Sequence, residues 1–259
     1  MGRHGSMSIK SLTVVTPTFH CKELILIFIK SFEKFKPSDL TVNYIVVENS
    51  MDVSYKEDVL ALCDNITWVN NDITLVGSAA NASGVEKGLE YVKDQWVFIA
   101  HCDVCVASEL FYSEMFQKIE EGYKLIGTVL DPCKARIGAI HISGYMMGTD
   151  MARKINFYPR ELDDGEGRMD VGDEATLYCR QNDIQHYCFE NTFNDASLTD
   201  VIDDKYKALY CDRCLNSRWE VIFLHLGRGI PKTEKTYDKP GKTYLEHWID
   251  FCYNEVLID

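Results

Sequence analysis

The segment Val97–Val106, VFIAHCDVCV, decides the expected fold and raises the main question about function. It begins as a run of strand-forming apolar residues and ends with His101 and Asp103, with a cysteine on either side of the acid. Strand interiors disfavour aspartate, so we place Asp103 at the end of a strand. A carboxylate at that place can bind a hard divalent cation such as Mg²⁺ or Mn²⁺. The alternative is an aspartate that caps the next helix or turn.

The change from strand to helix repeats along the first hundred residues. Apolar spacing predicts strands at 11–17, 41–48, 66–69 and 96–100, and helices at 21–35, 55–64 and 78–93. Strands separated by helices indicate parallel crossover units, whose ligands lie beyond the carboxyl ends of the strands. Glu48 and Asp103 both occupy such ends.

The pattern becomes less regular after residue 107. We expect helices at 109–121, 173–182 and 243–256, strands at 124–129, 139–146 and 219–224, and a loop rich in glycine and charge at 165–172. No internal repeat or low-complexity block interrupts the chain. The sequence therefore predicts an α/β protein, with a mixed, mostly parallel sheet flanked by helices in a single compact domain.

Composition excludes several classes of function. The 259 residues are 46% hydrophobic, which allows a sizeable core, and the net charge of −13 argues against a broad basic surface for nucleic acid. No apolar run reaches the length of a transmembrane segment. We expect a cytoplasmic protein and leave peripheral membrane association open. Residues 1–6 resemble a cloning leader before a native start at Met7.

The ten cysteines are scattered along the chain, which suggests reduced thiols. Two CxxC pairs stand out, Cys102/Cys105 and Cys211/Cys214. They are far apart for a zinc ribbon, so we interpret them as small packing residues and leave zinc open.

Four segments of the first half occur in an order that is known from one enzyme family. They are LTVVTPTF at 12–19, YIVVENS at 44–50, GSAANASGVEKGLE at 77–90 and FIAHCDVCV at 98–106. In this order they resemble family 2 glycosyltransferases of the GT-A fold, which move a sugar from a nucleotide diphosphate to an acceptor. The last segment matches the position of the DxD motif, with His101 in place of the first acid, as in a subgroup with a His-x-Asp pattern.

The second half continues the resemblance. HISGYMMGTDMARKI at 141–155 is similar to the acceptor-side segment, GDEATLYCRQNDI at 172–184 to the helix that begins with an acidic pair, and FLHLGRG at 223–229 to the late histidine-containing strand end. In an inverting transfer a base takes the proton of the acceptor hydroxyl. The resemblance makes Glu174 the first candidate for that base and Asp173 the second. The alternative is an acid-rich first turn favoured by the helix dipole.

The resemblance also implies binding roles. The donor-binding residues would be Pro17, Thr18, Glu48, Asn81, Asp103 and Arg228, and the metal ligands would be Asp103, His225 and His101. The cofactor would be Mn²⁺ or Mg²⁺, the donor a UDP-sugar, and the acceptor a saccharide or glycolipid. The four lysines from Lys232 to Lys242 suggest a basic flap over the nucleotide, although a solvated loop is the default interpretation.

These roles divide the chain into a leader (1–6), a nucleotide-sugar-binding half (7–107), an acceptor and catalytic half (108–230) and a C-terminal flap and helix (231–259). Two other functions stay open. A nucleotidyltransferase would want a glycine-rich phosphate loop after the first strand, where TPTFHCKE offers only Lys22. A non-catalytic nucleotide-sugar-binding module would lose the base or a metal ligand, and His101 is the residue that keeps this alternative open.

Overall fold

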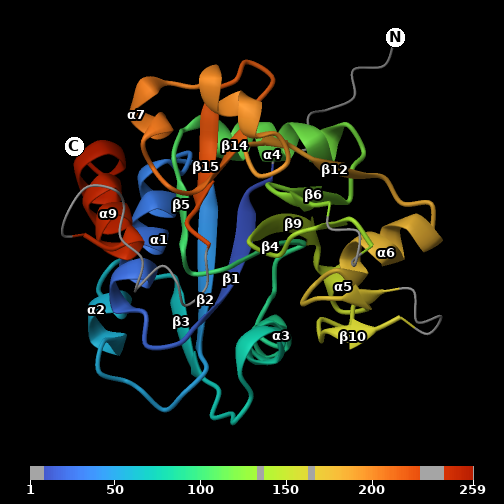
Figure 1. Ribbon diagram of the computed structural model, residues 1–259. Coiled ribbons are helices and arrows are strands. Elements are labelled where there is room, and N and C mark those ends of the chain that lie inside the picture. The colour runs from blue at the N-terminus through green and yellow to red at the C-terminus, as the bar shows by residue number, and fades with distance from the viewer. Residues whose placement is uncertain (1–8, 133–136, 163–166, 228–241, 259) are drawn as a thin grey trace.

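The computed structural model describes residues 9–132, 137–162, 167–227 and 242–258. A seven-stranded sheet runs through its centre in the order β12-β6-β9-β4-β1-β2-β3 (Figure 1). The strands are β1 (Ser11–Thr18), β2 (Thr41–Glu48), β3 (Ile66–Asn70), β4 (Trp96–Ala100), β6 (Leu125–Gly127), β9 (Gly144–Gly148) and β12 (His186–Cys188). Strands β3, β2, β1 and β4 are parallel, and β9 is antiparallel to its neighbours β4 and β6. The loops after β1, β2 and β4 therefore meet at one edge of the sheet, where ligands bind in folds of this kind.

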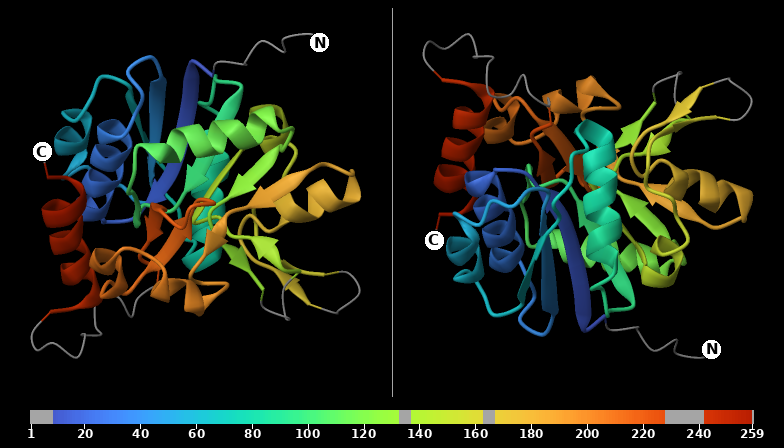
Figure 2. Two further views of the ribbon diagram at one scale, coloured as in Figure 1. Left: turned by 90° about the horizontal axis from the view of Figure 1, so that it is seen from above. Right: turned by 90° about the horizontal axis from the view of Figure 1, so that it is seen from below.

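Helices cover both faces of this sheet. One face packs against α1 (Lys22–Lys34), α2 (Lys56–Leu60) and α4 (Leu110–Glu120), and the other against α3 (Gly77–Leu89), α5 (Thr149–Ala152) and α6 (Glu174–Gln181). Figure 2 shows the two sides, with α4 in front of the sheet in the left view and α3 in front in the right view. Alternate residues of β4 enter opposite layers, since Phe98 joins the first cluster and Val97 and Ile99 the second.

A glycine allows α3 to lie close to the sheet. A Cβ added at Gly88 would lie 2.5 Å from Val15 Cγ1 and 3.2 Å from Val47 Cγ2, which leaves no room for a side chain. The helix therefore rests directly on β1 and β2, and its first turn is held at the carboxyl edge of the sheet.

A smaller antiparallel sheet carries the second half of the site. Its order is β13-β14-β15-β5, with β13 (Glu190–Asn191), β14 (Asp212–Leu215), β15 (Val221–His225) and β5 (Val104–Val106). Phe223 of β15 joins an aromatic cluster with Phe98 of β4 and Phe111 of α4, with ring centroids 5.4–5.8 Å apart. Each such pair contributes about 0.5–1.5 kcal/mol beyond burial. The cluster fixes β15 against the end of β4.

A third apolar cluster joins this small sheet to α1 and to the C-terminal elements, α7 (Asp204–Lys207), α9 (Tyr244–Phe251) and a π-helical turn at Cys252–Val256. Helix α9 begins with a capping box in which Thr243 and Glu246 exchange hydrogen bonds.

Two short hairpins complete the described strands. They pair β7 (Leu130–Asp131) with β8 (Ala139–Ile140) and β10 (Arg160–Glu161) with β11 (Arg168–Met169). No helix among the described residues is long and apolar enough to cross a membrane.

The predicted α/β fold with its mostly parallel sheet is confirmed, and four local predictions were wrong. The expected strand 139–146 is divided into β8 and β9 by a turn after Ile140, and the strand expected from Trp219 begins at Val221, because Trp219 has a φ of 65°. The loop expected at 165–172 contains β11, and the second predicted helix spans only Lys56–Leu60. The boundary near residue 107 stays a prediction.

Candidate functional site

A cavity of about 580 Å³ lies at the carboxyl edge of the central sheet. The end of β1 lines it with Pro17 and Thr18, followed by Phe19, and the start of α3 adds Gly77, Ala80 and Asn81. The opposite wall carries His101, Asp103 and His225 together with Asp131, His141 and Asp212. None of the described residues that line the cavity is a lysine or an arginine. The described lining includes three aspartates and three histidines.

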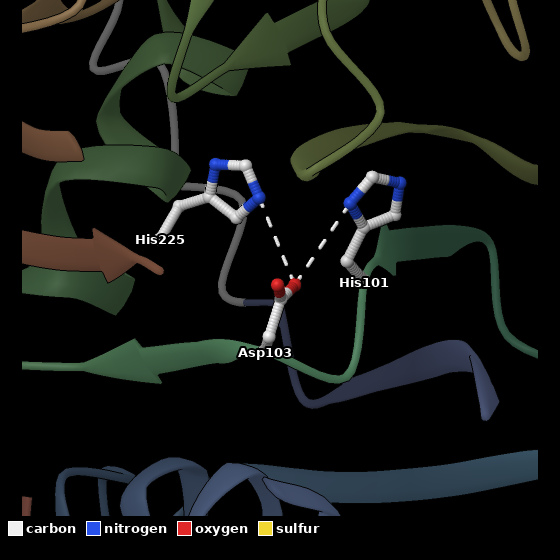
Figure 3. Close-up of side chains that lie close together, drawn as sticks. All are labelled: His101, Asp103 and His225. Carbon is white, nitrogen blue, oxygen red and sulfur yellow. Dashed lines mark ion pairs between the residues drawn. The ribbon is translucent and has the colours of Figure 1, made fainter. Parts of the chain in front are cut away.

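His101, Asp103 and His225 form a compact cluster in this wall. One ligand atom of each lies within 4.8 Å of the others, the only such group of three among the described His, Cys, Asp and Glu residues. His225 Nε2 is 3.7 Å and His101 Nδ1 is 3.9 Å from the same oxygen, Asp103 Oδ1. Figure 3 shows both rings turned toward this carboxylate. Asp103 and His225 are almost fully buried, and about a fifth of the His101 side chain is exposed.

Strand pairing brings the cluster together. His101 and Asp103 follow β4, and Asp103 directly precedes β5. β5 pairs with β15 so that His225 is opposite Val104, and the Leu226 amide donates a hydrogen bond to the Asp103 carbonyl (2.9 Å). The residues lie far apart in sequence and meet because the chain enters the small sheet directly after leaving the large one.

The donor set of this cluster fits a divalent cation. His225 Nε2 is buried and has no hydrogen-bond partner among the described residues. A buried polar atom without a partner is costly, and a metal ion would use its lone pair. The structure thus brings together all three predicted metal ligands, including His101, whose role in place of an acid the sequence left doubtful.

A third histidine faces the other two. The His141 ring centroid lies 5.4 Å from that of His101 and 5.8 Å from that of His225. Its Nδ1 accepts a hydrogen bond from the Ser143 amide (3.1 Å), so in the neutral ring Nε2 carries the proton. His141 is therefore arranged as a hydrogen-bond donor.

The predicted donor-binding residues are placed differently from one another. Pro17, Thr18 and Asn81 line the cavity, and Asn81 Oδ1 is a buried acceptor without a hydrogen-bond partner among the described residues. Glu48 ends β2 as expected but is fully buried and does not line the cavity. Arg228 lies outside the described residues, as do Lys232, Lys235 and Lys239 of the predicted flap.

The Glu48 carboxylate is occupied by its own neighbours. It accepts hydrogen bonds from the Tyr55 hydroxyl, from Ser50 Oγ (2.7 Å) and from the His20 amide (3.4 Å). Burial, followed by the hydrogen bond to Glu48, raises the pKa of Tyr55 well above its ordinary value, so the phenol stays a donor. The next residue, Asn49, lines the cavity in its place.

The predicted acidic pair begins α6, outside the described cavity wall. Asp173 is fully buried, and its Oδ2 accepts a hydrogen bond from the Asp170 amide (2.8 Å). Glu174 forms an ion pair with Arg160. Among the carboxylates that do line the cavity, Asp131 and Asp212 were missed. Asp212 gave little signal in the sequence, because no strand was expected at β14, where it lies.

The cysteines of the two CxxC pairs do not converge. Cys102 lines the cavity, Cys105 and Cys211 pack in the C-terminal apolar cluster, and Cys214 packs in the core beside α1 and α4. All nine described cysteines are free thiols. Burial raises the pKa of Cys188 to about 12 and that of Cys214 well above its ordinary value. These thiols stay protonated at neutral pH, as expected of packing residues.

No protein-family model matches the chain, and no curated protein matches it in sequence. Among solved structures it is similar to a mannosyltransferase from Pyrobaculum calidifontis in complex with GDP-Man and Mn²⁺, at 10% identity and a TM-score of 0.53. That alignment covers 71% of this chain and 55% of the mannosyltransferase, so the chain spans about half the length of that protein.

Two further solved structures share less of the architecture. Glucosyl-3-phosphoglycerate synthase from Mycobacterium tuberculosis is 12% identical with a TM-score of 0.47, and the alignment covers 69% of each chain. TarS from S. aureus is 11% identical with a TM-score of 0.44, covering 58% of this chain and 50% of that one. The sheet order and the likeness to the mannosyltransferase show that the chain has a GT-A fold.

Proposed function

We propose that this protein is a glycosyltransferase that moves a sugar from a nucleotide diphosphate to a saccharide or glycoconjugate acceptor. The observation that carries the proposal is the His101, Asp103 and His225 cluster in the wall of a cavity at the carboxyl edge of a GT-A sheet. Fold alone does not define function, but the cavity combines room for a nucleotide sugar with residues that fit a divalent ion.

The residues of the cavity support a metal-dependent reaction. Its described lining includes three aspartates, of which Asp103 belongs to the cluster that fits a divalent ion. A divalent ion held by His101, Asp103 and His225 would supply positive charge against the diphosphate leaving group. Phe19 and the first turn of α3 form the wall that would bind the nucleoside, with Asn81 Oδ1 as a hydrogen-bond acceptor.

For the acceptor proton we propose Asp131 as the base, because this residue lines the cavity. Glu174, which the resemblance favours, and Asp173 rank behind it, because both are engaged in contacts outside the cavity wall. An inverting transfer needs one base at the acceptor hydroxyl. His141 would donate a hydrogen bond from Nε2–H to an oxygen of either substrate.

The rival nucleotidyltransferase function loses support, because Lys22 forms an ion pair with Asp58 (2.6 Å) and does not line the cavity.

The proposal is tested by incubating the full chain with UDP-, GDP-, CDP- and dTDP-sugars in Mn²⁺ and measuring release of the nucleoside diphosphate with and without a panel of saccharide acceptors. We expect acceptor-stimulated release from one donor class. Release of pyrophosphate from a nucleoside triphosphate and a sugar phosphate would support a nucleotidyltransferase instead. Donor binding without release would support a binding module.

A further inference from the structure

A fourth residue belongs to the cluster at the cavity wall, although it offers no ligand atom to it. Asp212 lies on β14 directly opposite His225 on β15 in the antiparallel register. Its Oδ2 is 3.1 Å from His225 Nδ1, and only 8% of each side chain is exposed. The contact follows from the strand pairing, since directly opposite residues hold their side chains close together.

This contact decides which nitrogen of His225 carries the lone pair. The buried Asp212 carboxylate accepts a hydrogen bond from Nδ1–H, so the lone pair of the neutral ring lies on Nε2. Nε2 is the nitrogen that faces Asp103 Oδ1 at 3.7 Å and that lacks a hydrogen-bond partner among the described residues. A carboxylate behind a histidine in this way fixes the ring and makes it a stronger metal ligand.

The resulting donor set contains two imidazole nitrogens and one carboxylate oxygen. Mg²⁺ prefers oxygen ligands in strict octahedral geometry and gives up water reluctantly. Imidazole favours ions of the first transition row, and two histidines with one carboxylate form a common site for such ions. His101 is decisive here, because an acid at this position would leave two oxygens and one nitrogen.

We propose that this centre selects a first-row transition ion over Mg²⁺, and that Asp212 is the positioning residue that makes His225 a ligand. The inference deepens the proposed function, since the selected ion is the one that would serve the nucleotide diphosphate. The affinity for metal ions should follow the usual order for nitrogen-containing sites, with Co²⁺ bound more tightly than Mn²⁺. Mg²⁺ should bind at least about 10-fold more weakly than Mn²⁺, a difference of about 1.4 kcal/mol in binding free energy.

The experiment is a calorimetric titration of the full chain with Co²⁺, Mn²⁺ and Mg²⁺, each without nucleotide. The visible absorption of bound Co²⁺ provides a second readout that reports nitrogen ligation independently of any activity. Mg²⁺ affinity equal to that of Mn²⁺, or a Co²⁺ spectrum of the hexaaqua type, would overturn the proposal.

Three variants separate the parts of the argument. Asp212→Asn should weaken Co²⁺ and Mn²⁺ binding by about 10- to 100-fold and change the Co²⁺ spectrum, and Asp212→Glu should recover part of the affinity. His101→Asp should raise Mg²⁺ affinity relative to Mn²⁺. Asp58→Asn, which removes an exposed carboxylate that pairs with Lys22, is the matched control and should change none of these values.

A purely structural role of Asp212 would lower thermal stability and leave metal affinity unchanged, which would contradict the positioning role. If Asp212→Asn does not fold, the wild-type affinities and His101→Asp still decide the selectivity. These titrations contain no nucleotide, so they test the metal selectivity separately from the proposed function. If the protein selects transition ions but binds no nucleotide, the proposed function alone is refuted. A nucleotide response supported equally by Mg²⁺ and Mn²⁺ would refute the inference alone.

Discussion

His225, the last residue of β15, and Asp103, which directly precedes β5, face one another with Nε2 3.7 Å from Oδ1. The pairing of β15 with β5 sets this distance, and the cluster of Phe98, Phe111 and Phe223 holds that sheet against β4. The candidate metal centre is therefore a product of tertiary pairing between the two halves of the chain.

Removing the shared oxygen should abolish metal-dependent binding. We expect Asp103→Ala to remove the Mn²⁺-dependent affinity for a nucleoside diphosphate, because both imidazoles face Asp103 Oδ1. The fold should persist, since the side chain packs at the cavity wall and contributes nothing to the apolar clusters. Calorimetry with and without Mn²⁺ measures the effect, with Asp58→Ala as the control. Unchanged affinity would remove Asp103 from the site.

Two carboxylates compete for the role of base, and matched variants distinguish them. We expect Asp131→Asn to lower kcat by about 100-fold or more, the ordinary contribution of a general base, with little change in donor KM. Glu174→Gln should lower kcat by less than about 10-fold, because its carboxylate pairs with Arg160 outside the cavity wall. Steady-state kinetics with the identified donor decides, and the reverse pattern would restore Glu174 as the base.

The close contact of α3 with the cavity predicts a steric effect. A Cβ at Gly84 would lie 2.8 Å from Pro17 Cβ and 3.0 Å from both amide atoms of Asn49. Gly84→Ala should lower the free energy of unfolding by about 1–3 kcal/mol and weaken nucleotide binding, since Pro17 and Asn49 both line the cavity. Urea denaturation measures the stability. Gly148→Ala is the control, because nothing lies within 4 Å of an added Cβ there; equal losses in both variants would contradict the steric argument.

An ion pair between the turns after β1 and β2 predicts a pH dependence. His20 Nδ1 lies 2.8 Å from Asp52 Oδ2, and this hydrogen bond, as the largest cause, raises the pKa of His20 above 6.5. Hydrogen bonds from Ser54, and then that from His20, lower the pKa of Asp52 to about 2. Because the pKa of His20 is raised, its contribution to stability is complete below about pH 6.5 and is lost as the pH rises through the raised pKa. Because the pKa of Asp52 is lowered, its contribution to stability is complete above about pH 3.9 and is lost as the pH falls toward 2.

An NMR titration of His20 in the wild type and in Asp52→Asn tests this account. We expect the His20 pKa to fall in the variant, and the difference in stability between the two proteins to be larger at pH 5.5 than at pH 8.5. A His20 pKa that does not change on loss of the carboxylate would contradict it.

The order of the strands and helices of the first half could be predicted from the sequence, because each buried strand is followed by a helix with regular apolar spacing. β2 and β4 were predicted with their observed bounds. The second half was harder, because its strands are two to five residues long and pair with distant partners. Such strands depend on tertiary packing more than on local propensity.

The site was partly predictable for a related reason. His101, Asp103 and His225 carried a signal, since each follows or ends an apolar run. Asp212 and Asp131 carried little, because their roles depend on which strand lies opposite or on how a short hairpin turns toward the cavity. The Glu48 carboxylate lies at the predicted strand end, but the nearby Tyr55 hydroxyl, which sequence spacing does not reveal, occupies it.

The most direct test of the central claim is a thermal-shift screen of the full chain with UDP, GDP, CDP, ADP and dTDP, each with Mn²⁺ and with a chelator. A ligand that binds only the folded protein raises the free energy of unfolding by about 2.7 kcal/mol when the ligand concentration is a hundred times its Kd. We predict that one nucleoside diphosphate raises Tm in Mn²⁺ and that the chelator removes the shift. A Tm unchanged by every nucleotide would contradict the account.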